Sequence, residues 1–147
     1  MISAPDKCAV IFVPSLPLST VNIFPDFNGN VFYNDGFVGD KLSTLSIMGR
    51  DYFNRDGYIY HPDYKSFSCD AEAFYVAQMR GKHHYFDKII FKHQHPAWIG
   101  IGNDETYSKN SLATDHDLKV YWHRLNNYFF EPHDENTPIP YKQFMTK

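Results

Sequence analysis

The stretch SCDAEAFYVAQMRGK, from Ser68 to Lys82, predicts a short α-helix over residues 70–80. Gly81 follows the last helical position, and glycine is the residue that most often ends a helix. Small and apolar residues inside the stretch recur at helical spacing and supply a buried face. The residues that carry this pattern are Ala73, Phe74, Val76, Ala77 and Arg80.

Two acids, Asp70 and Glu72, open this predicted helix. At about 100° per residue they lie roughly 200° apart around the helix axis, so they cannot share one target. This excludes the paired carboxylates of a glycoside hydrolase, which flank one bond. One acid can face a cleft while the other packs elsewhere. The alternative is that both acids only stabilise the first helical turn, by about 0.3–1 kcal/mol each, through the helix dipole.

The next pair of side chains that can bind a metal or a proton lies in KHQHP, Lys92 to Pro96, which begins ten residues after Lys82. Alternate residues of a strand share a face, so His93 and His95 can point the same way at a strand end that Pro96 terminates. Two histidines are too few for a structural zinc site. They suit a site in which histidine joins carboxylate and phosphate oxygens around manganese or magnesium. The alternative is a solvated strand end that carries histidine.

Outward from these two motifs, the chain predicts strands interleaved with helices, which is typical of an α/β layered domain. A long amphipathic helix over residues 112–130 is indicated by Leu118, Tyr121, Trp122, Leu125 and Phe129. The prolines after residue 130 predict an extended tail. The remaining predicted elements are strands at 8–13, 31–34, 41–48 and 58–60, one or two strands over 84–86 and 88–93, and a short helical turn over 49–57.

Composition narrows the class of protein. The chain has 147 residues, enough for one domain with a core, and 18% of them are aromatic. A formal net charge of −3 with no basic block argues against a nucleic-acid binder. No apolar run is long enough to span a membrane. Cys8 and Cys69 are expected to be thiols in a reducing compartment, and we expect a cytoplasmic protein.

The run from Asp70 to Gly81 resembles the acid–helix–glycine signature of family 2 glycosyltransferases with the GT-A fold. Cys69-Asp70 stands where that family has a Glu-Asp pair, Arg80-Gly81 matches the helix end, and residues 89–93 match a strand that reaches a histidine. Upstream, SIMGRDYFNRDGYIYHPDY at 46–64 is similar to the segment before the acidic motif, particularly in a branch found in phages and viruses. The similarity covers about residues 24–130.

The resemblance implies a metal-assisted, inverting transfer of a sugar from a nucleotide-sugar donor to an acceptor hydroxyl. Asp70 would be the general base that accepts the proton of the acceptor. His93, or else His95, would help to hold a manganese or magnesium ion, which would neutralise charge on the departing diphosphate. Arg50 and Lys92 would assist that leaving group, or are simply surface cations. The residues assigned to substrate contact are Gly49, Arg50, Tyr58, Tyr64, Glu72, Lys92 and Trp98.

The chain departs from the family pattern in ways that define its expected organisation. Residues 1–23 do not supply the nucleotide-binding half, with its D-x-D metal motif, and are a divergent segment. Residues 24–130 would form the acceptor-side and metal-side region, and 131–147 a proline-rich tail. The fold is therefore expected to be a partial GT-A-like mixed sheet with flanking helices. A homodimer or a complementary chain is expected to cover the exposed side of that sheet.

Two other functions fit the same residues. A catalytically inactive relative could bind a glycan or a protein through its tyrosines, although aromatic residues equally fill a small core. A small metal-dependent hydrolase could use Asp70, His93 and His95, but the four-ligand pattern of such a site is not present in the sequence.

Overall fold

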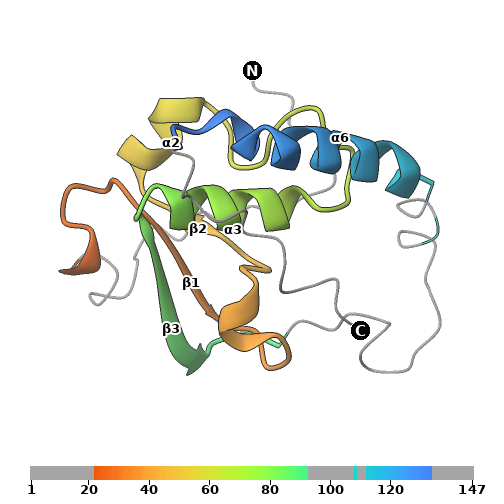
Figure 1. Ribbon diagram of the computed structural model, residues 1–147. Helices are drawn as coiled ribbons and strands as arrows, with labels where there is room; N and C mark the ends of the chain where they lie inside the picture. The colour runs from red at the N-terminus through yellow and green to blue at the C-terminus, as the bar shows by residue number, and fades with distance from the viewer. Residues whose placement is uncertain (1–21, 93–107, 109–111, 134–147) are drawn as a thin grey trace, which may run out of the picture.

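The structure is a computed structural model that describes residues 22–92, 108 and 112–133. Within these residues the chain forms a three-stranded mixed sheet and three α-helices (Figure 1). This confirms the expected mixed α/β class. The predicted strand at 8–13 and the predicted site residues His93, His95 and Trp98 lie outside the described residues.

The sheet is built around β1 (Asn30–Asn34), which lies between the other two strands. The short strand β2 (Ile47–Met48) pairs with it antiparallel, and β3 (His83–Ile89) pairs with it parallel. The predicted strand at 31–34 is thus confirmed. The β1–β3 register is interrupted after Tyr33, so that Asn34 is opposite Ile89. Parallel neighbours need a crossover, and the helices between β1 and β3 provide it.

The central strand is buried on both faces. Phe32 points towards the helices and meets Phe74 edge to face, with ring centroids 5.5 Å apart. Tyr33, on the opposite face, stacks on Phe86 of β3 at 5.0 Å. A strand covered on both faces reads as a continuous apolar run rather than an alternating one, which is what NVFYN shows.

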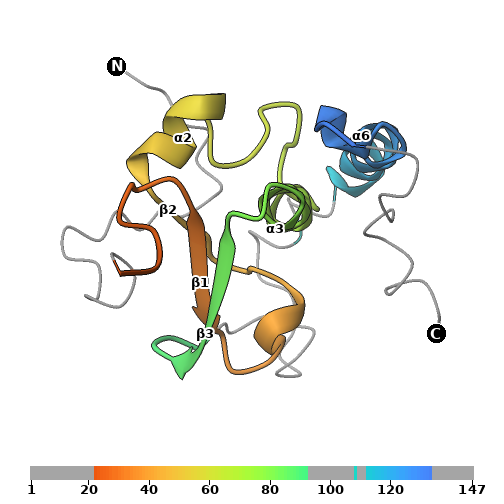
Figure 2. The same ribbon diagram turned by 60° about the vertical axis from the view of Figure 1, so that its left-hand side comes forward.

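Helix α3 (Cys69–Met79) confirms the helix predicted at 70–80. It ends as the sequence indicates: Gly81 has φ 62°, and the next amide, that of Lys82, donates to the carbonyl of Ala77 at 2.9 Å. Every residue from 72 to 77 is buried. Figure 2, which looks along the helix, shows the reason, because α3 lies between the strands and α6. A helix covered on opposite sides needs no polar face.

Helix α6 (Thr114–Asn126) confirms the central part of the helix predicted over 112–130. It stops early because the chain reverses in a short turn, η2 (Tyr128–Phe130), whose three residues have φ values of 52°, 52° and 62°. Left-handed backbone costs a non-glycine residue roughly 1–2 kcal/mol. The turn buries Phe129 to 2% exposure in the core, and it brings Glu131 back towards α3.

The short helix α2 (Arg50–Asp56) lies between Gly49 and Gly57, as the sequence predicts. Gly49 is required by close packing rather than by its backbone angle. A Cβ at this position would lie 2.0 Å from the carbonyl oxygen of Phe27. The amide of Gly49 donates to the carbonyl of Gly29 at 2.9 Å. Gly49 therefore seats α2 against the loop that precedes β1.

The strand predicted at 58–60 is wrong, and the strand predicted at 41–48 is confirmed only at its end. Residues 58–60 form no strand: Tyr58 turns back onto the ring of His61 at 5.1 Å, and the segment stays a compact loop. Within 41–48 only the last two residues are strand, and residues 39–41 form a 3-10 turn, η1 (Gly39–Lys41). The small polar residues there bond to each other instead of extending, with Ser43 and Ser46 hydroxyls 3.1 Å apart.

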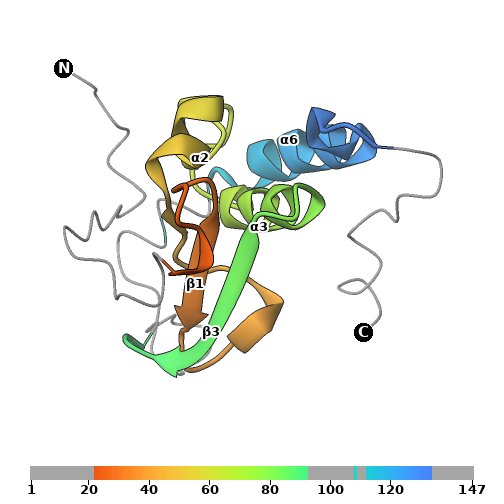
Figure 3. The same ribbon diagram turned by 90° about the vertical axis from the view of Figure 1, so that its left-hand side faces the viewer.

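All three helices gather at the end of the sheet where β1 and β3 begin, as Figure 3 shows. The opposite end, where both strands finish, carries η1 and the residues that follow β3. Lys92 is exposed there, with its side chain near Gly36. None of the helices in residues 22–92 and 112–133 is long and apolar enough to cross a membrane.

Candidate functional site

The two acids that open α3 have different surroundings. Glu72 is 4% exposed and faces α6, whereas Asp70 is half-buried in the first turn. This divergence follows from their angular separation around the helix. An oxygen of Asp70 accepts the amide hydrogen of Ala71 at 2.8 Å. The two carboxylates therefore serve separate purposes.

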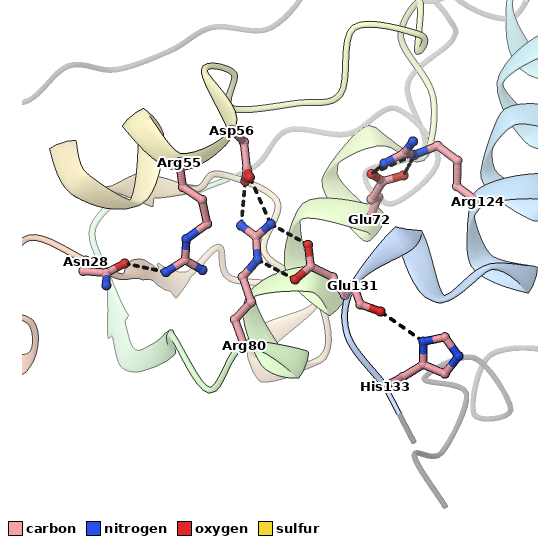
Figure 4. Close-up of polar contacts among 8 residues, drawn as sticks. All are labelled: Asn28, Arg55, Asp56, Glu72, Arg80, Arg124, Glu131 and His133. Carbon is pink, nitrogen blue, oxygen red and sulfur yellow. Dashed lines mark hydrogen bonds and ion pairs between the residues drawn. The ribbon is translucent and has the colours of Figure 1, made fainter. Parts of the chain in front are cut away.

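Glu72 is fully engaged within the protein. Its carboxylate binds the guanidinium of Arg124 through three contacts of 2.8–3.0 Å (Figure 4). It also accepts the hydroxyl hydrogen of Tyr64 at 2.7 Å. Burial, reinforced by the bond to Glu72, raises the pKa of Tyr64 far above its ordinary value. Burial opposes the charge of Arg124, but the Glu72 carboxylate outweighs it and the pKa of Arg124 is raised. Glu72 and Tyr64, both predicted as substrate contacts, thus use their polar groups to join α3 to α6.

A second arginine connects three parts of the fold. Arg80, at the end of α3, binds Asp56 of α2 at 2.6 and 3.0 Å and also binds Glu131, with Nε to Oε2 at 2.9 Å (Figure 4). Its guanidinium lies 5.3 Å from the ring centre of Tyr52. Burial disfavours the charge, but both carboxylates outweigh it and raise the pKa of Arg80.

Between these two arginines lies a cavity of about 30 Å³. A water molecule needs roughly 10–15 Å³ of such volume, so the space suits about two waters and is too small for a sugar ring. Burial, and after it the charge of Arg124, lowers the pKa of His61 at its wall. The buried hydroxyl of Tyr52 has no hydrogen-bond partner among the described residues. The cavity is lined by Met48, Tyr52, Asp56, Tyr58, Ile59, His61, Glu72, Ala73, Val76, Arg80, Arg124, Phe129 and Glu131.

The loop before α3 is held by a buried carboxylate from α6. Asp117 is 0% exposed, and its oxygens accept the amide hydrogens of Lys65, Ser66 and Phe67 at 3.0, 2.7 and 2.6 Å. The Nδ1 atom of His116 lies 2.8 Å from the same carboxylate. Burial opposes its negative charge, but His116 and the three amides outweigh burial and lower the pKa of Asp117.

The remaining predicted site residues are spread over several elements. Arg50 is exposed at the start of α2, Tyr58 lines the cavity, and Lys92 follows β3 at the far end of the sheet. Asp70 lies outside the cavity lining. Among residues 22–92, 108 and 112–133, no three histidine, cysteine or acidic side chains are placed to hold a metal ion. The predicted metal ligands His93 and His95 lie outside those residues.

Sequence reasoning missed Asp117 and Arg124. A signal was present, because Asp117, Tyr121, Arg124 and Leu125 fall at helical spacing on one face of α6, and all four are buried. Charged residues on an otherwise apolar helix face indicate buried partners. The spacing does not identify those partners, which are about fifty residues away in the chain.

Asp35 illustrates how an acidic turn is used structurally. One carboxylate oxygen accepts the amide hydrogens of Phe37, Val38 and Gly39 at 3.0, 2.8 and 3.4 Å, and the other accepts the Thr44 hydroxyl at 3.1 Å. Burial would raise the pKa of Asp35, but these hydrogen bonds outweigh it and lower that pKa below 3.8.

Asp35→Asn is therefore expected to alter the response to acid. A carboxyl group whose pKa is lowered by folding stabilises the protein above the unfolded pKa, and this stabilisation is lost as the pH falls through the folded pKa. At pH 7 the variant should be less stable by about 1 kcal/mol, the difference between charged and neutral hydrogen bonds. Urea unfolding at pH 7, 5, 3 and 2 measures this gap, which should shrink towards zero at the lowest pH.

The control for this experiment is Asp40→Asn, which removes an exposed carboxylate from the same turn. It should change stability by less than about 0.5 kcal/mol at every pH. A gap between wild type and Asp35→Asn that stays constant from pH 7 to pH 2 would contradict the assigned role of Asp35.

Comparison of the chain with protein-family models, with curated proteins and with solved structures finds no match.

Proposed function

We propose that this chain is a glycosyltransferase-like protein that corresponds to the acceptor-side part of a GT-A domain. In this proposal it transfers a sugar from a nucleotide-sugar donor to an acceptor hydroxyl, with inversion. Asp70 is the general base, and the acceptor hydroxyl must come within about 2.6–3.2 Å of its carboxylate. The motif similarity of residues 24–130 is the basis of the proposal.

The observation that carries the proposal is the difference between the surroundings of Asp70 and those of Glu72. An inverting transfer needs one carboxylate that can reach the acceptor. Arg124 and Tyr64 bind both carboxylate oxygens of Glu72. Glu72 can therefore fix α3 but cannot take a proton from a bound ligand without breaking these bonds. Asp70 is half-buried at the helix start, where the positive end of the helix dipole favours negative charge.

A divalent cation, manganese or magnesium, would neutralise the charge that grows on the departing diphosphate. His93 and His95 are the proposed ligands, and Lys92 and Arg50 are the proposed cationic contacts to the leaving group. Lys92 and Arg50 are both exposed, but they lie at opposite ends of the sheet, so one diphosphate can contact only one of them.

A second candidate is a catalytically inactive relative that binds a glycan or a protein. Exposed aromatic side chains are available for such binding, including Phe37 and Phe67, which are 47% and 49% exposed.

A thermal-shift experiment distinguishes these functions. The full chain is heated with UDP-sugars or GDP-sugars, with and without Mn²⁺, and the same samples are assayed for release of the nucleoside diphosphate. A donor that binds the folded state at 100 times its Kd stabilises it by about 2.7 kcal/mol, which raises the Tm by several degrees. We expect this rise only when donor and Mn²⁺ are both present.

The other outcomes assign the other functions. No shift with any nucleotide sugar would reject the transferase and leave the binding module. A shift without diphosphate release would identify an inactive relative that has kept its donor site. Hydrolysis that depends on zinc and needs no nucleotide would identify a metal-dependent hydrolase.

A further inference from the structure

We propose that Asp117 is a positioning residue, which sets the loop before α3 so that Asp70 faces the acceptor. This inference rests on the proposed function of Asp70. It concerns how α6, which contains none of the predicted catalytic or metal-binding residues, would control the geometry of the site.

The first support is that the Asp117 carboxylate serves another segment rather than its own helix. Asp117 is the fourth residue of α6, and its own amide donates to the carbonyl of Ala113 at 2.9 Å, as in a regular helix. Its side chain instead accepts hydrogen bonds from the backbone amides of Lys65, Ser66 and Phe67 at 2.6–3.0 Å. Three successive amides directed at one buried carboxylate fix the path of the loop.

The second support is that α6 also anchors the part of α3 that directly follows Asp70. Arg124 follows Asp117 by seven residues, or two helical turns, so both side chains leave the same face about 10 Å apart along the axis. Arg124 binds Glu72, two residues after Asp70, while Asp117 binds Phe67, three residues before it. The short segment that contains Asp70 is thus anchored at both ends to one rigid helix.

The third support is a strained residue between the two anchors. Ser68, immediately before α3, has φ 61° and ψ 2°, a left-handed conformation that costs roughly 1–2 kcal/mol for a residue other than glycine. Such residues persist where the surrounding structure holds them in place. The adjacent contact from the Cys69 thiol to the carbonyl of Ser66, at 3.5 Å, belongs to the same arrangement. Without the Asp117 anchor, the loop is free to relax this strain and move the start of α3.

The test compares Asp117→Asn with the matched control Asp115→Asn, which removes an exposed acid from the same helical turn. Asparagine keeps the size and one acceptor oxygen of Asp117, so the variant should fold. Hydrogen exchange by mass spectrometry needs no donor, and it should show the amides of residues 65–67 exchanging about tenfold faster in Asp117→Asn, with no change in Asp115→Asn.

The second readout is turnover of the donor identified by thermal shift. Displacing a catalytic group by about 1 Å can reduce turnover about 100-fold, so Asp117→Asn should lower kcat by roughly 10–100-fold while the KM for donor stays constant. Because Asp117 acts through Asp70, adding Asp117→Asn to Asp70→Asn should cause no further loss.

Unchanged exchange at residues 65–67 would overturn the anchoring role. Faster exchange with unchanged kcat, or an additive loss in the double variant, would overturn the positioning role. If wild type turns over no donor, the proposed function fails, and the exchange experiment still decides whether Asp117 fixes the loop.

Discussion

Arg124→Met is expected to lower the free energy of unfolding by about 3–5 kcal/mol. The substitution leaves the Glu72 carboxylate, whose side chain is 5% exposed, buried beside Tyr64 without its cation. Breaking a buried ion pair from one side costs this much because the remaining charge stays desolvated. Methionine fills a similar volume, so the loss measures the charge rather than a cavity. Urea unfolding at pH 7, followed by circular dichroism, gives the value.

Two further variants test the cause of that loss. Arg55→Met removes an exposed arginine that donates to Asn28 at 3.2 Å, and it should cost less than about 1 kcal/mol. The double variant Glu72→Gln/Arg124→Met removes both charges and should recover part of the loss, which a double-mutant cycle quantifies. If the double variant is less stable than the sum of its two single variants predicts, Glu72 and Arg124 do not stabilise each other.

Asp70→Asn is expected to reduce donor turnover by about 10²–10⁴-fold, the usual contribution of a general base. The amide has nearly the same shape as the carboxylate but cannot accept the acceptor proton. Because Asp70 would act in the chemical step, kcat should fall while the KM for donor changes little. Steady-state kinetics at saturating Mn²⁺ measures both constants, with the thermal shift confirming that the variant still binds donor.

The matched control is Asp51→Asn, which neutralises an exposed acid in the first turn of α2. Both substitutions remove one favourable interaction with a helix dipole, worth about 0.3–1 kcal/mol, so their effects on stability should be similar. Only Asp70→Asn should lose turnover. Equal activity of the two variants would remove Asp70 from the catalytic role and leave it as a helix-start acid.

Local patterns in the sequence predicted most of the regular elements. β1 follows from the apolar run after a turn, α3 from helical spacing ended by Gly81, and α2 from its two flanking glycines. The strand predicted at 58–60 failed because the apolar triplet Tyr58-Ile59-Tyr60 fits a compact loop as well as a strand, and the packing of Tyr58 on His61 favours the loop. Such outcomes depend on tertiary contacts that a short window does not contain.

The candidate site was predictable in part. Helical geometry alone separates Asp70 from Glu72, but it does not say which of them faces inward, because that depends on how α3 is rotated against β1 and α6. Arg124 decides this rotation, and it lies 52 residues from Glu72 in the chain. The Asp117 contacts span a similar distance. In the local sequence, such a pairing is visible only as a charged residue on an otherwise apolar helix face.

The left-handed turn after α6 sets a practical limit on how far the polypeptide can be shortened. By reversing the chain at Tyr128–Phe130 it returns Glu131 to Arg80, so a version ending at Asn127 would lose a carboxylate that neutralises this buried cation. It would also lose Phe129, whose ring packs near Tyr75 and Tyr121. Recombinant versions meant for crystallisation or for isotope labelling should therefore keep the sequence at least through residue 131, and affinity tags belong beyond it.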